Sequence, residues 1–322
     1  RHTVLPLQVT PCETLLELVR HYDQPFSDPS AIPSLAVSQL ARQHVTVVLN
    51  GDGGDEIFAG YRRHLAAHLA GSLESLPRGW VHGLAGGVAA VLGRMAGRRR
   101  SRMGFAARWF RGLGLEPSAR YLAWTADKLQ EEDKKAAWCG PPVRSTEEWL
   151  DRVRPAGLGA LDTQAATDIR VNMLSGLLVK MDMATMAYSL EARSPLLDHR
   201  LAEFVVSLPA VHRLRGWRLK SLLRDGWRDR LSDEVIGGKK RGFEIPLESW
   251  LDGALREPLM DTLGSESARV RNYLDGSLVD GLLEGGALSD RNRPTLLYSL
   301  LVLELWLREF ESSSVSSERQ VA

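Results

Sequence analysis

The chain has 322 residues and a formal net charge of +1, from 41 Lys and Arg against 40 Asp and Glu. This near balance excludes a protein built mainly on attraction to a nucleic-acid backbone, so no nucleic-acid partner is expected. The 25% charged and 44% hydrophobic residues are ordinary for a globular protein. The longest apolar stretches, 84–92 and 296–303, are shorter than the roughly 18 residues of a membrane span, so no span is expected either.

The two cysteines, Cys12 and Cys139, support no disulfide framework and indicate a reducing compartment, hence a cytoplasmic location. The first residue is Arg1, and nothing near it is typical of a signal peptide. We therefore expect the chain to be a piece of a longer protein. The arginine-rich run 98–102 carries no recognition module that would make it a nucleic-acid site.

Residues 1–65 are predicted to form the edge of an α/β fold. Helices are expected at 13–22 and 35–43, and the Pro, Ser and Asp residues of 23–33 predict a loop between them. The run VTVVL at 45–49 is typical of a strand buried on both faces of a parallel sheet. A glycine-rich turn, NGDGGDE, follows it directly.

Beyond residue 65 no comparable strand is found, and 66–310 is predicted to be mainly helical. The clearest helix is 163–190. Its apolar residues recur every three or four positions and predict one buried stripe: Ile169, Met173, Leu177, Met181 and Ala184. Further helices are expected at 201–208, 218–230 and 294–310. The Ser-rich, charged tail 311–322 is predicted to be disordered.

Two acids, Asp52 and Asp55, lie in the turn after the predicted strand. In open α/β sheets ligands bind at the carboxyl ends of strands, and glycines let backbone N–H groups approach an anion. Carboxylates beside a phosphate site indicate Mg²⁺, which is usually shared with substrate phosphates. The same acids could instead offset the dipole at a helix N-terminus, and both interpretations stay open. The spacing does not fit an EF-hand calcium loop.

Charged residues gather again near the end of the long predicted helix, at Asp182, Glu191, Arg193 and Asp198. Such acids are rarely buried without partners, so they indicate either a site or structural ion pairs such as Glu191–Arg193 and Asp198–Arg200.

A third segment, at 237–250, places Lys239, Lys240 and Arg241 between glycines. A mobile cationic loop of this kind could neutralise charge on a phosphate, and a solvated basic turn is equally compatible with the spacing.

Taken together, these segments resemble the synthetase domain of the glutamine-hydrolysing asparagine synthetase family. Five motifs occur in the family's order: DQPFSDPS at 23–30, VVLNGDGGDEIFAGY at 47–61, a D-x-x-S-M-A-x-S-L-E-x-R-x-P-x-L-D pattern at 182–198 with Thr185 for the first Ser, K-x-x-L-R at 220–224, and K-x-G-F-x-x-P-L-x-x-W at 240–250. The resemblance implies an adenine-nucleotide alpha-hydrolase-like α/β fold, here with a truncated parallel sheet and a large helical remainder, and one synthetase domain over 1–310.

The resemblance also implies an activity. Family members bind ATP with Mg²⁺, adenylate a carboxylate that is normally the side chain of aspartate, and release pyrophosphate. Ammonia from an N-terminal glutaminase domain, expected upstream, then displaces AMP to form the amide. A homodimer is compatible with this resemblance.

Each motif thereby acquires an expected role. Lys240 and Asp52 are the expected catalytic residues, and Asp55 is the expected Mg²⁺ ligand. The nucleotide is expected at Asn50, Gly51, Gly53 and Asp55. The substrate is expected at Asp182, Glu191 and Arg193.

Several features depart from the family pattern. The S-G-G-x-D-S phosphate loop is not found in the 322 residues, and Cys12 is not a chain-terminal glutaminase nucleophile. We therefore expect the chain alone neither to turn over ATP nor to hydrolyse glutamine. Asn50 replaces the usual Ser, and Ser194 replaces a bulkier residue, so the acceptor could be a sugar, a peptide or another carboxylate. A non-catalytic binding or assembly module derived from this domain is the alternative.

Overall fold

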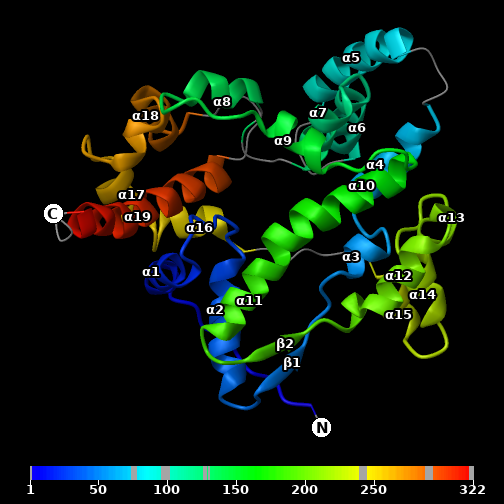
Figure 1. The fold of residues 1–322 in the computed structure, drawn as a ribbon, viewed down its shortest axis with the longest axis horizontal. Coiled ribbons are helices and arrows are strands. Elements are labelled where there is room, and N and C mark those ends of the chain that lie inside the picture. Colours follow the sequence, from blue (N-terminus) through cyan, green and yellow to red (C-terminus); the bar gives the residue numbers. More distant parts are fainter. Residues whose placement is uncertain are drawn as a thin grey trace.

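A long, interrupted helix crosses the middle of the molecule (Figure 1). The computed structural model describes residues 2–73, 78–95, 102–125, 129, 131–238, 245–286 and 293–318. The long helix consists of α10 (Ala160–Asp168), the π-helical η1 (Ile169–Leu177) and α11 (Leu178–Met186). The C-terminal helices lie on one side of it and α12 to α15 on the other, with the two strands near its C-terminal end.

The remaining helices range from a single turn to the 26 residues of α19. Before the long helix lie α1 (Pro11–Tyr22), α2 (Ala31–Arg42), β1 (Val47–Leu49), α3 (Gly54–Ile57), α4 (Arg62–Gly71), α5 (Arg78–Met95), α6 (Arg102–Leu113), α7 (Pro117–Thr125), α8 (Glu131–Ala137) and α9 (Thr146–Val153). After it lie β2 (Glu191–Arg193), η2 (Pro195–Leu197), α12 (His199–Ser207), α13 (Ala210–Arg213), α14 (Ser221–Gly226), α15 (Asp233–Gly237), α16 (Leu247–Asp252), α17 (Arg256–Leu263), η3 (Arg269–Asn272), α18 (Gly276–Leu283) and α19 (Arg293–Glu318).

The two N-terminal helices confirm the sequence prediction with different boundaries. Helix α1 begins two residues early because Pro11 occupies its first turn, where the missing N–H costs nothing. It ends where Asp23 adopts a left-handed conformation with φ of 53°. Helix α2 begins at Ala31, so the predicted loop 23–33 is shorter than expected.

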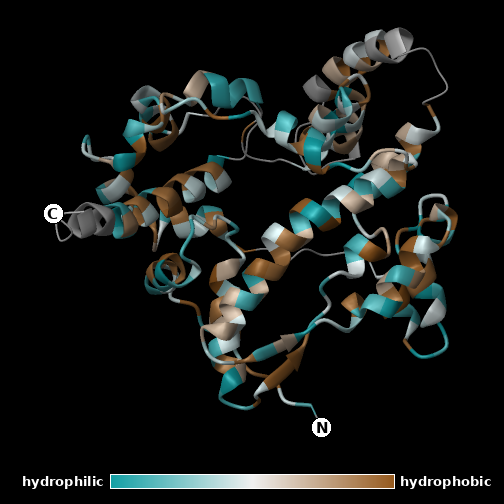
Figure 2. Cartoon of the chain, in the orientation of Figure 1, coloured by the Kyte–Doolittle hydropathy of each residue, from teal (hydrophilic) through white to brown (hydrophobic). Residues whose placement is uncertain are grey.

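The predicted strand forms, but its expected burial on both faces is wrong. β1 pairs in parallel with β2, with Val48 opposite Ala192, and within the described ranges β2 is its only partner strand. Val47 and Leu49 point to the same side and are 39% and 71% exposed. Figure 2 shows β1 as an apolar strand at the rim of the molecule. β2 was not predicted because it has no apolar run, and it forms through main-chain pairing.

The long helix differs from the predicted 163–190 helix in two ways. It runs from Ala160 and ends at Met186, before Ser189 takes a left-handed φ of 53°. Of the expected buried stripe, only Met173 and Ala184 are fully buried. The reason is η1, because its i→i+5 hydrogen bonds turn the helix faces away from the 3.6-residue period.

The shorter predicted helices change mainly in length. The helix expected at 201–208 is α12, whose N-cap Asp198 accepts hydrogen bonds from the N–H groups of Arg200 and Leu201. The helix expected at 218–230 is reduced to α14. The helix expected at 294–310 is α19, which continues to Glu318 and so enters the tail for which disorder was predicted. Residues 319–322 lie outside the described part of the chain.

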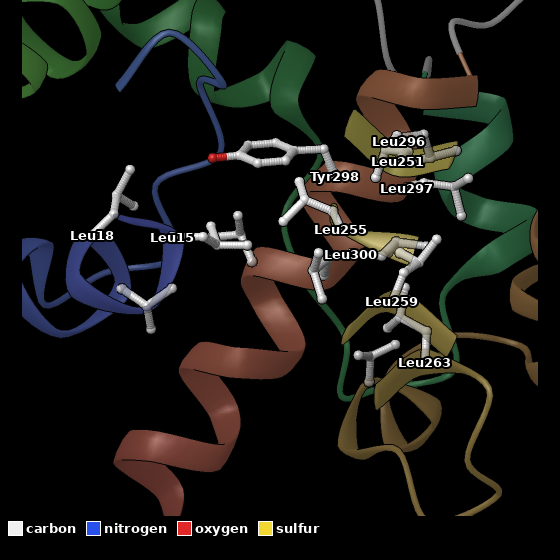
Figure 3. Packing of buried hydrophobic residues seen from close by; sticks show 14 of the residues in the cluster. Leu15, Leu18, Leu251, Leu255, Leu259, Leu263, Leu296, Leu297, Tyr298 and Leu300 are labelled. Carbon is white, nitrogen blue, oxygen red and sulfur yellow. The ribbon is translucent and has the colours of Figure 1, made fainter. Parts of the chain in front are cut away.

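The main hydrophobic core surrounds α19. Figure 3 shows leucines of α1, α16 and α17 gathered around this helix, together with Tyr298. Leu15, Leu18, Leu255 and Leu263 are at most 1% exposed. Each such leucine contributes about 1.5–3 kcal/mol on burial, so this core ties the two ends of the chain together.

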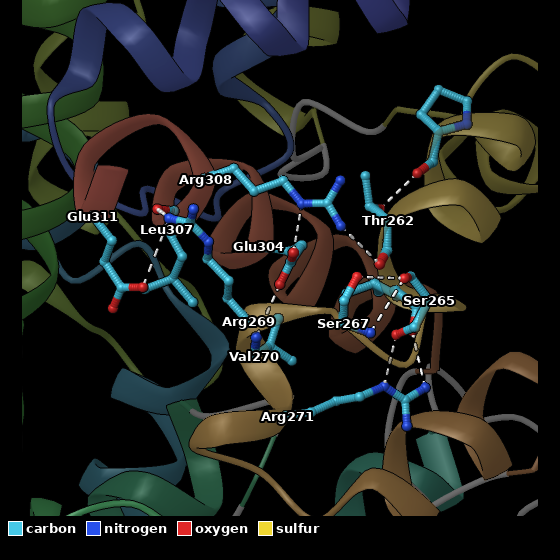
Figure 4. A network of polar contacts seen from close by, with 12 residues as sticks. Thr262, Ser265, Ser267, Arg269, Val270, Arg271, Glu304, Leu307, Arg308 and Glu311 are labelled. Atoms are coloured by element: carbon cyan, nitrogen blue, oxygen red, sulfur yellow. Dashed lines mark hydrogen bonds and ion pairs between the residues drawn. The ribbon is translucent and has the colours of Figure 1, made fainter. Parts of the chain in front are cut away.

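A polar network joins the segments that pack on α19 (Figure 4). The carboxylate of Glu304 is fully buried, accepts a hydrogen bond of 2.9 Å from the Val270 N–H and forms an ion pair of 2.6 Å with Arg308. Arg308 also donates to the carbonyl oxygen of Thr262 at 3.2 Å. A buried carboxylate persists only when its oxygens are satisfied, so Glu304 fixes α17 and η3 against α19.

A second buried network joins α4 to the junction of α10 and η1. The Asp168 carboxylate is fully buried and has three hydrogen-bond partners. His64 Nε2 and Arg63 Nε each lie 2.8 Å from it, and the Tyr121 hydroxyl donates to it at 2.9 Å. Burial would raise the pKa of Asp168, but the His64 hydrogen bond and the Arg63 charge hold it below its usual value. Burial lowers the pKa of His64. The network anchors α4, which comes after the 50–56 turn and α3 in the chain.

Candidate active site

The turn after β1 is held by a short chain of side-chain hydrogen bonds. Asn50 continues the strand pairing, because its N–H donates to the carbonyl oxygen of Arg193 at 2.9 Å. Its side-chain oxygen accepts the Ser194 hydroxyl at 2.6 Å and the Asp52 N–H at 3.3 Å. Its amide nitrogen donates to Asp52 Oδ2 at 2.9 Å. A hydrogen bond therefore joins Asn50 and Ser194, the two positions that depart from the family pattern.

A cavity of about 430 Å³ opens beside this turn. It lies between the C-terminal half of the long helix and the ends of the two strands, and its volume is within the range of small-molecule sites, about 300–1,000 Å³. Its lining combines polar and apolar side chains: Asn50, Asp52, Leu174, Leu178, Val179, Met181, Asp182, Thr185, Met186, Glu191, Ala192 and Ser194. Four residues predicted from two distant motifs, Asn50, Asp52, Asp182 and Glu191, thus surround one space.

The charge of Asp52 depends on its surroundings. Burial raises the pKa of Asp52, the Glu56 carboxylate adds to this effect, and the Lys180 ammonium opposes it. Lys180 itself binds Asp28 Oδ2 at 3.1 Å and the Ser30 hydroxyl at 2.9 Å. Burial would raise the pKa of Asp28, but the Lys180 charge and the Ser30 hydrogen bonds hold it below its usual value.

The expected substrate residues are placed differently from one another. Asp182 and Glu191 line the cavity, whereas Arg193 does not. The Arg193 side chain is 63% exposed and its Nε lies 2.7 Å from Glu191 Oε1. The ion-pair interpretation of these two residues is therefore confirmed, as is the 3.1 Å pair of Asp198 with Arg200.

Asp55 lies apart from the cavity lining. It occupies the first turn of α3, where a carboxylate offsets the helix dipole, and it forms an ion pair of 2.8 Å with Lys220. Gly60 makes this arrangement possible, because a Cβ at residue 60 would overlap Asp55 and the Lys220 side chain. The neighbouring Glu56 is buried and accepts a hydrogen bond from the Tyr61 hydroxyl.

Asp55, the expected Mg²⁺ ligand, fits a metal site only if substrate phosphates supply further ligands. Within the described ranges, no group of three or more His, Cys, Asp or Glu side chains converges as a protein-only metal site would require. Mg²⁺ is commonly held by one or two carboxylates together with substrate phosphates, so Asp55 suits a cation that arrives with a nucleotide. Lys240 lies outside the described residues, so its place relative to the cavity stays a prediction.

Gly53→Ala is expected to destabilise the protein by about 2 kcal/mol or more, because a new Cβ would overlap Leu197 and residue 53 has a φ of 82°. Urea unfolding measures this. Gly51→Ala is the matched control, since a Cβ there meets nothing within 4 Å. Equal stability of the two variants would contradict the geometry of the turn.

Two lysines near the acids of the turn were not predicted from the sequence: Lys180, whose charge acts on Asp52, and Lys220, which pairs with Asp55. Both belong to recognisable segments, since Lys220 begins the K-x-x-L-R motif and Lys180 stands two positions before Asp182. Their partners could not be read from spacing, because Lys180–Asp28 and Lys220–Asp55 join residues more than a hundred positions apart.

A larger hollow of about 1120 Å³ lies between α8, α9 and α19. Leu296, Leu300 and Leu303 line it from α19, and none of the predicted site residues contributes to it.

Among the described helices, none combines the length and hydropathy that a membrane crossing requires.

The fold and the cavity describe a mostly helical α/β domain with a carboxylate-lined site beside a parallel strand pair. The family model described as "Asparagine synthase" matches residues 1–308. The chain therefore belongs to the asparagine synthase family.

Individual relatives agree with this assignment. The chain is 26% identical over 292 residues to asparagine synthetase [glutamine-hydrolyzing] 1 of Bacillus subtilis, a match over 91% of this chain and 45% of the relative. It is 28% identical over 321 residues to a Mycobacterium tuberculosis protein provisionally named as an asparagine synthetase [glutamine-hydrolyzing], over 94% of this chain and 45% of the relative. The chain thus spans less than half the length of these relatives.

Proposed function

We propose that this chain is the ATP-dependent synthetase part of a glutamine-dependent amidotransferase. One synthetase domain over 1–310, with an adenine-nucleotide alpha-hydrolase-like sheet, belongs to this proposal. The observation that carries it is the cavity, which brings Asn50 and Asp52 of one family motif beside Asp182 and Glu191 of another. Membership in the asparagine synthase family supports the same chemistry.

The proposed reaction has two steps. A substrate carboxylate oxygen attacks the α-phosphorus of ATP, and the bond from that phosphorus to the bridging oxygen breaks, releasing pyrophosphate. Ammonia, supplied by hydrolysis of glutamine in a glutaminase domain, then attacks the acyl carbon. The C–N bond forms, the C–O bond to AMP breaks, and one proton leaves the nitrogen.

The residues of the turn suit distinct parts of this reaction. The backbone at Gly51 gives an anion close access, since the position carries no side chain and the space beside it is open, whereas Leu197 fills the corresponding space at Gly53. Asp52 is the proposed proton acceptor for the attacking ammonia, because its raised pKa makes it a stronger base than an ordinary surface aspartate. Lys240 is proposed to neutralise charge on the phosphates.

Asp55 is proposed as the residue that would hold Mg²⁺ together with the pyrophosphate part of ATP. When bound, the ion would supply positive charge to offset that of the phosphates. Lys220 already lies 2.8 Å from Asp55, so this side of the turn presents one carboxylate and one ammonium to an incoming nucleotide.

ATP–pyrophosphate exchange with the full-length natural protein tests the proposal. Carboxylate-dependent exchange and AMP formation are expected, with aspartate and other carboxylates offered separately. The 322 residues on their own are expected to be inactive, because the S-G-G-x-D-S phosphate loop is not among them.

Two outcomes would count against the proposal. A full-length protein that forms no acyl-adenylate with any carboxylate would instead support a binding or assembly module. Exchange by the 322 residues alone would show that the phosphate loop is dispensable, and would overturn that expectation.

A further inference from the structure

One stretch of the sequence concentrates positive charge. Residues 75–115 contain eight of the 41 Lys and Arg residues, all of them arginine, and none of the 40 acidic residues. The rest of the chain is therefore net negative. The stretch covers α5 and α6, and it includes the arginine-rich run 98–102, for which the proposed reaction has no use.

The outer face of α5 is apolar and open. Leu84, Val88 and Val91 are 69%, 38% and 55% exposed, and their spacing places them on one side of the helix. Among the described residues nothing closes this side, since a Cβ at Gly83 or Gly87 would meet no atom within 4 Å. Residues 83–93 carry no polar side chain at all, so this exposed part of α5 is not adapted to water.

Another side of α5 is fixed to the body of the protein. Ala85 and Ala89 are buried, and α5 packs against α6. Ala85 belongs to a small core with Leu113 and Trp109 of α6. Trp109 Nε1 donates to the carbonyl oxygen of Ala66 at 2.9 Å, which ties α6 to α4. Figure 1 shows α5 beside α6 at the outer edge of the molecule, so the helix pair presents the apolar face outward.

An anionic bilayer surface matches both the apolar face and the charge. Leucine and valine side chains of such a helix enter the boundary between headgroups and acyl chains, while arginines are attracted to anionic headgroups. The stretch 75–115 has no carboxylate that would be repelled by those headgroups. Residues 83–93 extend about 16 Å as a helix, roughly half the hydrocarbon thickness, so α5 suits a position along the surface.

Other partners fit fewer of these features. A nucleic acid would attract the arginines but would leave the leucine and valine face in water. A second copy of the chain would cover the apolar face, but it would also bring the arginines of two such stretches together with no acid of the same stretch between them. The combination of apolar face and charge therefore favours a lipid surface.

We propose that α5 is a peripheral docking surface for an anionic membrane. Leu84, Val88 and Val91 enter the bilayer boundary, and arginines of α5 and α6, among them the exposed Arg111, bind anionic headgroups. The attachment is reversible, because one short apolar face gives weak membrane binding. This inference concerns where the protein works, and it does not depend on the proposed reaction.

The test measures sedimentation of the full-length natural protein with lipid vesicles. Mixed vesicles of phosphatidylglycerol and phosphatidylcholine are expected to bind it at least about 10-fold more strongly than phosphatidylcholine alone, because anionic headgroups attract arginine. Added salt is expected to weaken this binding. The double variant Leu84→Gln/Val91→Gln is expected to bind the mixed vesicles about 10-fold more weakly, because two side chains lose their apolar contact.

Phe204→Gln/Val211→Gln is the matched control, because these side chains are 58% and 55% exposed on α12 and α13, outside the α5–α6 pair. Its vesicle binding is expected to equal that of the natural protein. Hydrogen exchange supplies a measurement that needs no variant. Exchange of the amides of 83–92 is expected to slow when mixed vesicles are added and to stay unchanged with phosphatidylcholine alone.

Several results would overturn the inference. Equal binding to both kinds of vesicle, or binding to neither, would exclude an anionic membrane as the partner. Unchanged exchange at 83–92, or full binding by Leu84→Gln/Val91→Gln, would place the contact elsewhere on the protein. A dimer that this double variant dissociates, with no vesicle binding, would assign the face to a second copy. Binding to RNA but not to vesicles would assign the arginines to a nucleic acid. Each of these results would leave the proposed amide-forming reaction standing.

Discussion

Lys240→Ala is expected to lower amide synthesis by at least about 100-fold in the full-length protein, because a preorganised cation acts where charge develops in the transition state. Glutamine hydrolysis is expected to stay largely intact, since the proposed role of Lys240 concerns only the phosphates. Parallel assays of amide formation and glutamate release measure the two activities. The expectation rests on the K-x-G-F motif at 240–243, which lies outside the described residues.

The control for this variant is Lys135→Ala, which removes an exposed ammonium on α8 away from the turn. Neither activity is expected to change. An equal loss of synthesis and hydrolysis in Lys240→Ala would speak against a role at the phosphates, because it would indicate general damage to the protein.

Asp168→Ala is expected to destabilise the protein by about 3–5 kcal/mol, because it leaves the largely buried Arg63 guanidinium, 17% exposed, without its counter-charge. Arg63 Nε and His64 Nε2 both lie 2.8 Å from Asp168 Oδ2, and the Tyr121 hydroxyl would lose its acceptor as well. Urea or thermal unfolding measures the change. Glu309→Ala removes one side of the exposed 3.2 Å pair with Arg20 and is expected to cost about 0–1 kcal/mol. Similar losses in the two variants would contradict the central place of Asp168.

The same network gives stability a direction with pH. Both Asp168 and His64 have pKa values lowered by the fold, so the unfolded chain binds more protons in acid. The network's contribution to the free energy of unfolding is therefore fully present above the pKa of His64 in the unfolded chain, about 6.5, and decreases as the pH drops below that value. It decreases further as the pH approaches the ordinary pKa range of aspartate. A melting temperature that rises on acidification from about pH 7 to pH 5 would contradict this sign.

Much of the fold could be predicted because it depends on local patterns. The proline at the start of α1 and the β-branched run of β1 mark elements through propensities that act within a few residues. β2 could not be predicted, because Glu191, Ala192 and Arg193 form a strand only by pairing with β1. The π-helical η1 was missed because the apolar spacing from Ile169 to Ala184 fits an ordinary helix equally well.

The candidate site divides in the same way. Its motif residues Asn50, Asp52, Asp182 and Glu191 were found from composition and order, and the cavity shows that they share one space. Arg193 was expected beside them but pairs with Glu191 outside the lining. Lys180 was overlooked because it and its partner Asp28 are 152 positions apart in the sequence.

Residue types and their order were enough to indicate the asparagine synthase family and the chemistry of carboxylates beside a glycine-rich turn, because those features are local. Only the folded chain showed that Asn50 meets Ser194, that Lys180 and Arg193 are engaged by acids, and that Asp182 faces the cavity without a protein partner in the described part of the chain. The physical reason is that ion pairing and burial depend on distances between residues far apart in sequence, and packing alone sets those distances.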